Sequence, residues 1–281
     1  MPRRIGYPSS MHPRARLLLN SAHIELWPAW LLRARGNADA RLIARTRWVM
    51  RRKSDGRYLA ALSHHGDVTA MSERLGHEPG LAEALHWRGR RSFKRAAASH
   101  PPLDLPMHAL DARLQQLGLD AADYAERSGL VRINEPDWLA LAGFDRWRRP
   151  LWLRDDAARA WTRMQSTALA DGIVLDAISG YRSHAYQLGI FERKRARGQS
   201  VDDILSVNAA PGFSEHHSGK VLDIGTADEP PAEESFEATP AFDWLTRHAG
   251  EHGFVMSYPR DNPHGIVYEP WHWRYRGIAA D

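Results

Sequence analysis

The chain has 281 residues, of which 43% are hydrophobic, so it can form one large domain or two small ones around a sizeable core. It contains no cysteine, which excludes disulfides and thiolate metal sites, so any metal must be held by His, Asp or Glu. No window of about 18 apolar residues occurs, and the sequence therefore predicts no membrane span.

The net charge of +4 conceals an asymmetry between the two parts of the chain. Residues 1–105 carry 19 Lys and Arg against 8 Asp and Glu, whereas residues 106–281 carry 19 against 26. A basic segment can contact nucleic acid or anionic lipid. The acidic remainder argues against nucleic acid as the partner of the whole chain, and we expect none for residues 107–281.

Residues 1–106 show weak periodic organisation, with Arg scattered through them. The proline-rich run over residues 99–106 is typical of a linker, and we place a domain boundary there. Three interpretations of residues 1–106 stay open: a disordered or loosely helical basic extension, a small accessory domain, or an overlong start with Met107 as the real beginning. We favour the first, a basic and poorly organised N-terminal extension.

From residue 107 onward the predicted elements are clearer. Apolar spacing and chain breakers predict helices over residues 109–117, 121–127, 137–142, 155–170, 185–197 and 239–252. In the last of these, Thr239 is a candidate N-cap, Pro240 the first helical residue, and Gly253 lies past the end. Apolar, β-rich runs predict strands over residues 173–178, 221–224, 254–258 and 271–275. This mixture without a βαβ period predicts an α+β fold, a small antiparallel sheet with flanking helices.

Two runs near the C-terminal end contain residues suited to metal chemistry. In the run EPWHWRY over residues 269–275, Glu269 and His272 are the right types for a general base beside a metal ligand. Pro270 biases this run away from helix, so we expect it to be extended or bent.

The second run is SEHHSGKVLD, residues 214–223. Asp223 lies in an apolar strand, where a carboxylate is costly unless it is paired, hydrogen-bonded or bound to a metal. A cation shared with His272 and with a histidine of the preceding turn would satisfy it, leaving a fourth position for water. Strand alternation favours His217 over His216 if the strand extends back that far, but Gly219 can instead mark a turn into the strand.

These runs carry a family resemblance. S-x-H-x-x-G-x-x-x-D, followed by E-P-W-H-x-R-Y-x-G and preceded by S-G-Y-R-S-x-x-x-Q, resembles the VanY-type D-alanyl-D-alanine carboxypeptidases. These belong to zinc metallopeptidases that include D-Ala-D-Ala dipeptidases and endolysins. The resemblance covers about residues 150–277, which we take as the catalytic core of a peptidase domain over 107–281. One departure is Val221, where the family usually has Ala.

The resemblance implies a role for each matching residue. It assigns His216, Asp223 and His272 as ligands of one zinc ion per chain, and so prefers His216 to His217. Glu269 matches the catalytic base, and Arg182 matches the arginine that stabilises the oxyanion. Ser214 and Gln187 match positions that hold the terminal carboxylate of the substrate.

The implied function is a zinc-dependent D,D-carboxypeptidase that removes the C-terminal D-Ala from peptidoglycan stem peptides or their precursors. The alternatives within the family are a D,D-dipeptidase and a peptidoglycan endopeptidase. A non-catalytic cell-wall binding module would lack the base or a ligand, and all are present. The substrate places the protein in the cell envelope or periplasm. Because no clear signal peptide is visible, a cytoplasmic location stays the alternative.

Overall fold

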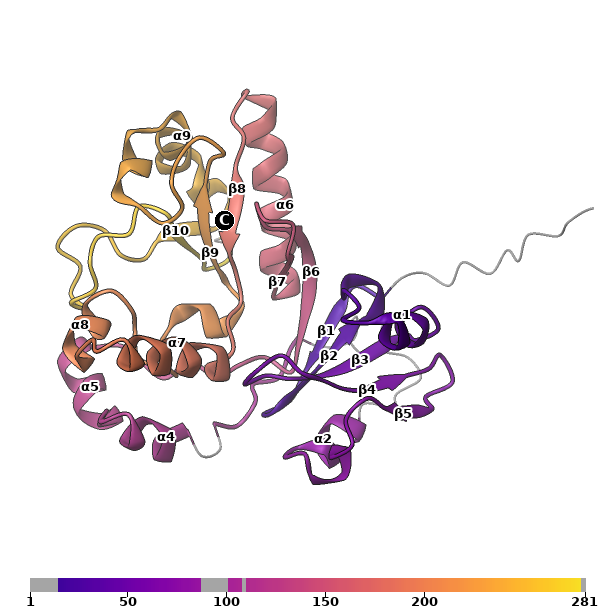
Figure 1. The fold of residues 1–281 in the computed structure, drawn as a ribbon. Coiled ribbons are helices and arrows are strands. Elements are labelled where there is room, and N and C mark those ends of the chain that lie inside the picture. Colours follow the sequence, from indigo (N-terminus) through magenta and orange to yellow (C-terminus); the bar gives the residue numbers. More distant parts are fainter. Residues whose placement is uncertain (1–14, 87–100, 108–109, 279–281) are drawn as a thin grey trace, which may run out of the picture.

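The computed structural model describes residues 15–86, 101–107 and 110–278, which form helices and two antiparallel sheets (Figure 1). The elements alternate without a repeating βαβ unit, and the α+β class expected from the sequence is confirmed. Among these residues, no helix combines the length and the apolar character needed to cross a bilayer.

The larger sheet has seven strands in the order β5-β4-β3-β2-β1-β6-β7, and each strand is antiparallel to its neighbours. Its strands are β1 (Leu17–Asn20), β2 (Ile24–Pro28), β3 (Trp48–Arg52), β4 (Tyr58–Leu62), β5 (Val68–Ala70), β6 (Trp138–Phe144) and β7 (Pro150–Leu153). Two short helices, α1 (Asn37–Ile43) and α2 (Leu81–His86), accompany the first five strands.

Strands β1 to β5 correct the expectation of a poorly organised extension, as far as residues 15–86 are concerned. The scattered arginines suggested a solvated, unfolded segment. Several of them instead form ion pairs within the folded sheet. Arg51 contacts the buried Glu25 at 3.1 Å, and Arg52 contacts Glu78 at 2.5 Å, so these charges are compatible with a folded sheet. Residues 1–14 and 87–100, on which the prediction of disorder also falls, lie outside the described residues.

Strand pairing crosses the predicted boundary at residue 106. Strand β1 pairs with β6 in a register that sets Leu17 opposite Ala140 and Leu19 opposite Trp138. An isolated bridge also links Asp104 to Pro136. Of the three interpretations of the N-terminal region, the described residues therefore favour an accessory structure that is built into the rest of the protein.

The described helices after residue 107 lie close to the predicted ranges, except that no helix was predicted over residues 201–206. They are α4 (Leu110–Gln116), α5 (Ala121–Ser128), α6 (Asp155–Ala170), α7 (His184–Ala196), α8 (Val201–Ser206) and α9 (Pro240–His248), the last extended by a 3-10 turn (Ala249–His252). Thr239 caps α9 by accepting a hydrogen bond from the backbone N of Phe242, and Gly253 ends the following turn with a φ of 79°.

The helix predicted over residues 137–142 is wrong, because this segment forms β6. Trp138, Leu139, Ala140 and Leu141 are all buried, since both faces of β6 are covered. A short apolar run of this kind has neither the alternation of a half-exposed strand nor the length that would separate strand from helix. Strand β7 was not predicted for the same reason.

The smaller sheet has the order β10-β11-β9-β8 and holds the residues of chemical interest. Its strands are β8 (Asp176–Ser179), β9 (Val221–Gly225), β10 (Phe254–Met256) and β11 (His272–Tyr275). One hydrophobic core includes residues of both sheets and of α6, among them Leu153, Trp161 and Leu222. In Figure 1, α6 accordingly runs between β8 of the smaller sheet and β6 of the larger one.

Candidate metal site

Three predicted ligands converge on one point. His216 lies in a short 3-10 helix (Glu215–Ser218), Asp223 in β9 and His272 in β11. The register of the smaller sheet sets His272 directly opposite Asp223. All three side chains are buried, and one ligand atom from each lies within 4.8 Å of the other two.

Gly219 makes the turn that brings His216 to the cluster. It follows the 3-10 helix with a φ of 67°, a conformation in which glycine has no steric penalty. A Cβ at this position would lie 2.5 Å from Cδ2 of Leu139, so the turn also needs the missing side chain. Because β9 begins only at Val221, the strand alternation that favoured His217 does not reach back to that residue.

His217 points away from the cluster. Its Nδ1 donates to the carbonyl of Arg182 at 2.7 Å, and its Nε2 accepts from the backbone N of Gly212 at 3.1 Å. Both ring nitrogens therefore have backbone partners. Of the two adjacent histidines, the structure brings only His216 to Asp223 and His272, as the family resemblance implies.

Hydrogen bonds fix which nitrogen of each histidine faces the cluster. Nδ1 of His216 donates to the carbonyl of Gly180 at 2.7 Å, which leaves Nε2 beside Asp223 at 3.3 Å. Nε2 of His272 contacts Glu215 at 3.1 Å, which leaves Nδ1 beside Asp223 at 3.2 Å. Histidines that bind metals are commonly oriented in this way, by a carboxylate or carbonyl on the other ring nitrogen.

The electrostatics of the cluster favour cation binding. Burial, together with the charge of Arg182, lowers the pKa of His216 to about 4, so its imidazole is neutral at pH 7. Burial would raise the pKa of Asp223, but His216, His272 and Arg182 outweigh it and hold the pKa well below its ordinary value. Burial also opposes protonation of His272, yet hydrogen bonds to Asp223 and Glu215 raise its pKa to about 10. Metal binding would require His272 to give up this proton.

Glu269 lies next to the cluster. Its Oε2 is 3.4 Å from Nδ1 of His272, and Pro270 and Trp271 form a turn between the two residues, as the sequence indicated. Burial raises the pKa of Glu269 to about 7. A carboxylate with this pKa can both accept and release a proton near neutral pH.

Arg182 contributes a positive charge to the site. It follows β8, and its Nη2 lies 2.8 Å from Oδ2 of Asp223 and 2.7 Å from Nε2 of His216. Its Nε donates to Ser179 at 3.1 Å. Arg182 also contributes to the wall of a cavity of about 400 Å³ that Trp27 and Trp152 line on the side of the larger sheet.

Ser214 and Gln187 are buried near these elements without contacting the cluster. Ser214 precedes the 3-10 helix of His216, and its side chain makes no capping hydrogen bond. Gln187 lies on α7, where its Nε2 donates to the carbonyl of Ala209 at 3.1 Å. Its Oε1 is buried and has no hydrogen-bond partner among the described residues.

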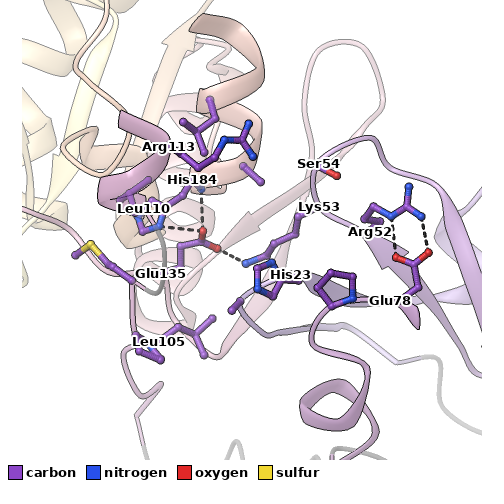
Figure 2. A pocket seen from close by; sticks show the side chains of 16 residues that line it. His23, Arg52, Lys53, Ser54, Glu78, Leu105, Leu110, Arg113, Glu135 and His184 are labelled. Carbon is purple, nitrogen blue, oxygen red and sulfur yellow. Dashed lines mark hydrogen bonds and ion pairs between the residues drawn. The ribbon is translucent and has the colours of Figure 1, made fainter. Parts of the chain in front are cut away.

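Two acidic residues of this region were missed in the sequence. Glu215 contacts both His272 and Arg274, and its position between Ser214 and His216 was an available signal. Glu135 contacts residues on both sides of Arg182 in the chain and is paired with Lys53 from the larger sheet. Glu135, Lys53 and His184 also line a separate cavity of about 350 Å³ (Figure 2). No local sequence pattern marks Glu135 or Lys53.

The donor set fits zinc. Two imidazole nitrogens and one carboxylate oxygen are ligands that zinc prefers, and three protein ligands are typical of catalytic rather than structural zinc sites. The residues Glu215 and Gly180 that orient the two histidines complete the arrangement.

Comparison with known proteins finds a family that matches the second half of the chain. Residues 150–278 match the VanY family, described as D-alanyl-D-alanine carboxypeptidase. The chain is 35% identical over 134 residues to the putative carboxypeptidase YodJ of Bacillus subtilis, covering 46% of this chain and 48% of YodJ. It is 30% identical over 155 residues to the bifunctional D-Ala-D-Ala dipeptidase and carboxypeptidase VanXYC of Enterococcus gallinarum, covering 53% of this chain and 79% of that protein.

A solved structure of the vancomycin resistance D,D-pentapeptidase VanY from a VanB-type cassette, in complex with Zn(II), is 28% identical. The match covers 46% of this chain and 75% of that one, with a TM-score of 0.39. The chain spans about half the length of YodJ, and most of the larger sheet lies outside the family match.

Proposed function

Because this chain belongs to the VanY family of D-alanyl-D-alanine carboxypeptidases, we propose that it is a zinc-dependent D,D-carboxypeptidase. Its substrate would be a peptidoglycan stem peptide or precursor, from which it removes the C-terminal D-Ala. The observation that carries the proposal is the convergence of His216, Asp223 and His272, with Glu269 beside them.

One zinc ion per chain would be held by His216, Asp223 and His272. When bound there, zinc would supply Lewis-acid chemistry, which includes lowering the pKa of a water molecule to about 7. The neutral state of His216 and the ionised state of Asp223 are those that metal binding requires.

Glu269 would move the proton. Its carboxylate takes a proton from the attacking water as the water oxygen bonds to the carbonyl carbon of the terminal peptide. It then passes this proton to the amide nitrogen as the C–N bond breaks, which releases D-Ala and a shortened peptide. The pKa of about 7 suits both transfers, and general acid–base catalysis of this kind contributes about 10²–10⁴-fold in rate.

Arg182 would donate hydrogen bonds to the oxyanion that develops on the carbonyl oxygen. Its hydrogen bond to Asp223 and its place in the wall of the adjoining cavity support this role. Loss of one such donor costs about 10²–10³ in rate. The hydroxyl of Ser214 and the side-chain amide of Gln187 would hold the free carboxylate of the terminal D-Ala.

A D,D-dipeptidase is the second candidate, and a peptidoglycan endopeptidase is a third. The dipeptidase is supported by VanXYC, whose name gives both activities and of which this chain covers 79%. The two activities differ in substrate, since the dipeptidase cleaves free D-Ala-D-Ala and the carboxypeptidase cleaves a longer peptide that ends in it. Because a peptidoglycan stem peptide belongs to the cell envelope, we propose that location over the cytoplasm.

The proposal is tested by measuring zinc content and D-Ala release for the wild type and for Glu269→Gln. The substrates are a pentapeptide ending in D-Ala-D-Ala and the free dipeptide. We expect one zinc per chain in both proteins, and a loss of kcat of about 10²-fold or more in the variant. Full activity of Glu269→Gln would show that the base is misassigned.

Two neighbouring histidines provide a matched control for the metal ligands. His216→Ala should lose zinc, whereas folded His217→Ala should retain it, because both ring nitrogens of His217 are hydrogen-bonded to backbone groups away from the cluster. Retention of zinc by His216→Ala would overturn the assignment of the ligands.

A further inference from the structure

We propose that Glu135 is a positioning residue for Arg182, held in place by Lys53 from the N-terminal part of the larger sheet. The inference rests on the proposed function, in which Arg182 stabilises the oxyanion. It gives the residues that precede the family match a role in the reaction, because Lys53 and Glu135 both lie before residue 150.

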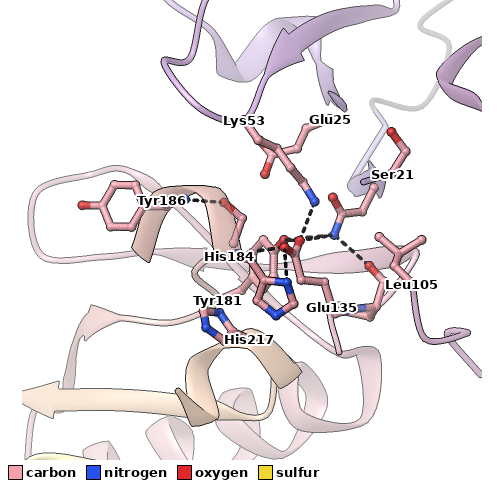
Figure 3. Close-up of polar contacts among 12 residues, drawn as sticks. Ser21, Glu25, Lys53, Leu105, Glu135, Tyr181, His184, Tyr186 and His217 are labelled. Carbon is pink, nitrogen blue, oxygen red and sulfur yellow. Dashed lines mark hydrogen bonds and ion pairs between the residues drawn. The ribbon is translucent and has the colours of Figure 1, made fainter. Parts of the chain in front are cut away.

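Glu135 holds the chain on both sides of Arg182 (Figure 3). Its Oε2 accepts a hydrogen bond from the hydroxyl of Tyr181, the residue directly before Arg182. Its Oε1 accepts from the backbone N of His184, two residues after Arg182, at 2.8 Å. One buried carboxylate thus spans the short loop from which the guanidinium projects.

The same loop is tied to the metal cluster by its backbone. The N–H of Arg182 donates to the carbonyl of His216 at 3.3 Å, and the carbonyl of Arg182 accepts from Nδ1 of His217 at 2.7 Å. The ring of His184 packs edge-on against that of His217, with 4.3 Å between the ring centroids. A displacement of the loop would therefore move Arg182 relative to His216 and Asp223.

Lys53 and Asn20 fix Glu135 from the other side. Lys53 lies just beyond the end of β3, and its Nζ is paired with Oε2 of Glu135, with side-chain exposures of 1% and 5%. Asn20, at the end of β1, donates to the same oxygen at 3.2 Å. In Figure 2, Lys53 and His184 approach Glu135 from different parts of the fold.

This arrangement keeps the carboxylate charged. Burial alone would raise the pKa of Glu135, but Lys53 and His184 lower it to about 2. A charged carboxylate is a stronger acceptor for the Tyr181 hydroxyl and the His184 amide than a neutral amide would be. The charge and the position of the Glu135 carboxylate together restrict the conformation of the loop over 180–184 more than packing alone would.

The test uses Glu135→Gln, with Glu78→Gln as the matched control. Glu78 also forms an ion pair, with Arg52 of β3, and among the described residues its carboxylate has no hydrogen bond to the loop over 180–184. We expect Glu135→Gln to lower kcat by about 10- to 100-fold, with KM and zinc content changed much less. Glu78→Gln should leave kcat within about two-fold of the wild type.

A double variant separates positioning from stability. Glu135→Gln leaves the Lys53 charge buried without its partner and should lower the melting temperature. Lys53→Met/Glu135→Gln removes that charge, so the melting temperature should recover while kcat stays low. Recovery of kcat together with the melting temperature would overturn the proposal, because Glu135 would then act on the fold alone.

Coupling to Arg182 gives a second readout. In an Arg182→Ala background, Glu135→Gln should reduce kcat by no more than about two-fold, because the residue that it positions is absent. An undiminished 10- to 100-fold loss in that background would contradict the inference.

Hydrogen exchange tests the inference even if the wild type releases no D-Ala and the proposed function fails. The amides of residues 181–184 should exchange faster in Glu135→Gln than in Glu78→Gln. Equal exchange in both variants would rule out positioning by Glu135, independently of any activity.

Discussion

Glu135 carries its charge on an almost fully buried side chain, and this has a consequence for stability. Its carboxylate is buried beside Lys53, and its pKa in the folded protein is about 2, against an ordinary value of 4.5. An unfolded chain therefore binds a proton at Glu135 under conditions in which the folded chain does not. Folding and the protonation of this residue are linked.

The linkage predicts a loss of stability in acid. Because the folded pKa is depressed, the stabilisation is fully present above about pH 4.5 and is lost as the pH falls towards 2, amounting to about 3 kcal/mol. Denaturant unfolding at pH 6, 4.5 and 3 measures this. Lys53→Met/Glu135→Gln should show a shallower decline than the wild type over the same range. Parallel declines would mean that Glu135 is not the group involved.

A residue of the site could be predicted from the sequence only where it lies in a short motif. His216, Asp223, His272, Glu269 and Arg182 stand in short runs of characteristic spacing, and the structure brings all five together. Lys53 and Glu135 are 82 positions apart, and only the fold makes them a pair. Their residue types alone are those of ordinary surface charges.

Among the elements, the turn at Gly219 decides whether the metal cluster can form. It connects the 3-10 helix of His216 to the strand of Asp223, and its carbonyl accepts from the backbone N of Arg154 at the start of α6 at 2.7 Å. The turn thus links the two ligands to the core helix. Its left-handed backbone and its closeness to Leu139 leave no room for a side chain.

Gly219→Ala should therefore be destabilising, by about 1 kcal/mol for the backbone and a further 1–3 kcal/mol for the clash. Gly172→Ala is the matched control, because Gly172 has a φ of 79° but open space where a Cβ would lie. Unfolding midpoints and zinc content compare the two variants. Equal midpoints would show that contact with Leu139 is unimportant.

Helices with characteristic residues at their ends could be predicted from the sequence. Elements without such residues could not. The two aspartates at the start of α6 and the Thr-Pro start of α9 gave helix positions that the structure confirms. β6 and β7 have no such signals; β6 pairs with β1, which is far away in the chain, and β7 pairs with β6. The sequence did not reveal β1, whose pairing with β6 extends the larger sheet to β6 and β7.

At the scale of the whole molecule, the N-terminal strands and the metal cluster belong to one connected structure. β1 pairs with one edge of β6, and Lys53 forms an ion pair with Glu135, which contacts the loop that carries Arg182. Removal of residues 1–106 would uncover β6 and leave a buried carboxylate without its cation. The cost of an unpaired buried charge alone is about 3–5 kcal/mol, a large part of the stability of most domains.

A chain limited to residues 107–281 should therefore fail to fold cooperatively, and should be poorly soluble and deficient in zinc. Solubility, thermal unfolding and metal content are the measurements. Co-expression with residues 1–106 should restore a soluble complex, because the missing strand and lysine return. A soluble, active 107–281 fragment with the stability of the full chain would show that the N-terminal strands are dispensable.

The pairing of Leu17 with Ala140 also sets an order of events during synthesis. The ribosome delivers β1 to β5 first, and domains form as their parts emerge, at roughly 5–20 residues per second. β6, the second neighbour of β1, has not been synthesised at that stage. For several seconds the backbone groups along that edge of β1 therefore lack their partners in β6. Contacts of such long sequence separation slow folding. The nascent chain is thus most vulnerable to misassociation before residue 144 has emerged.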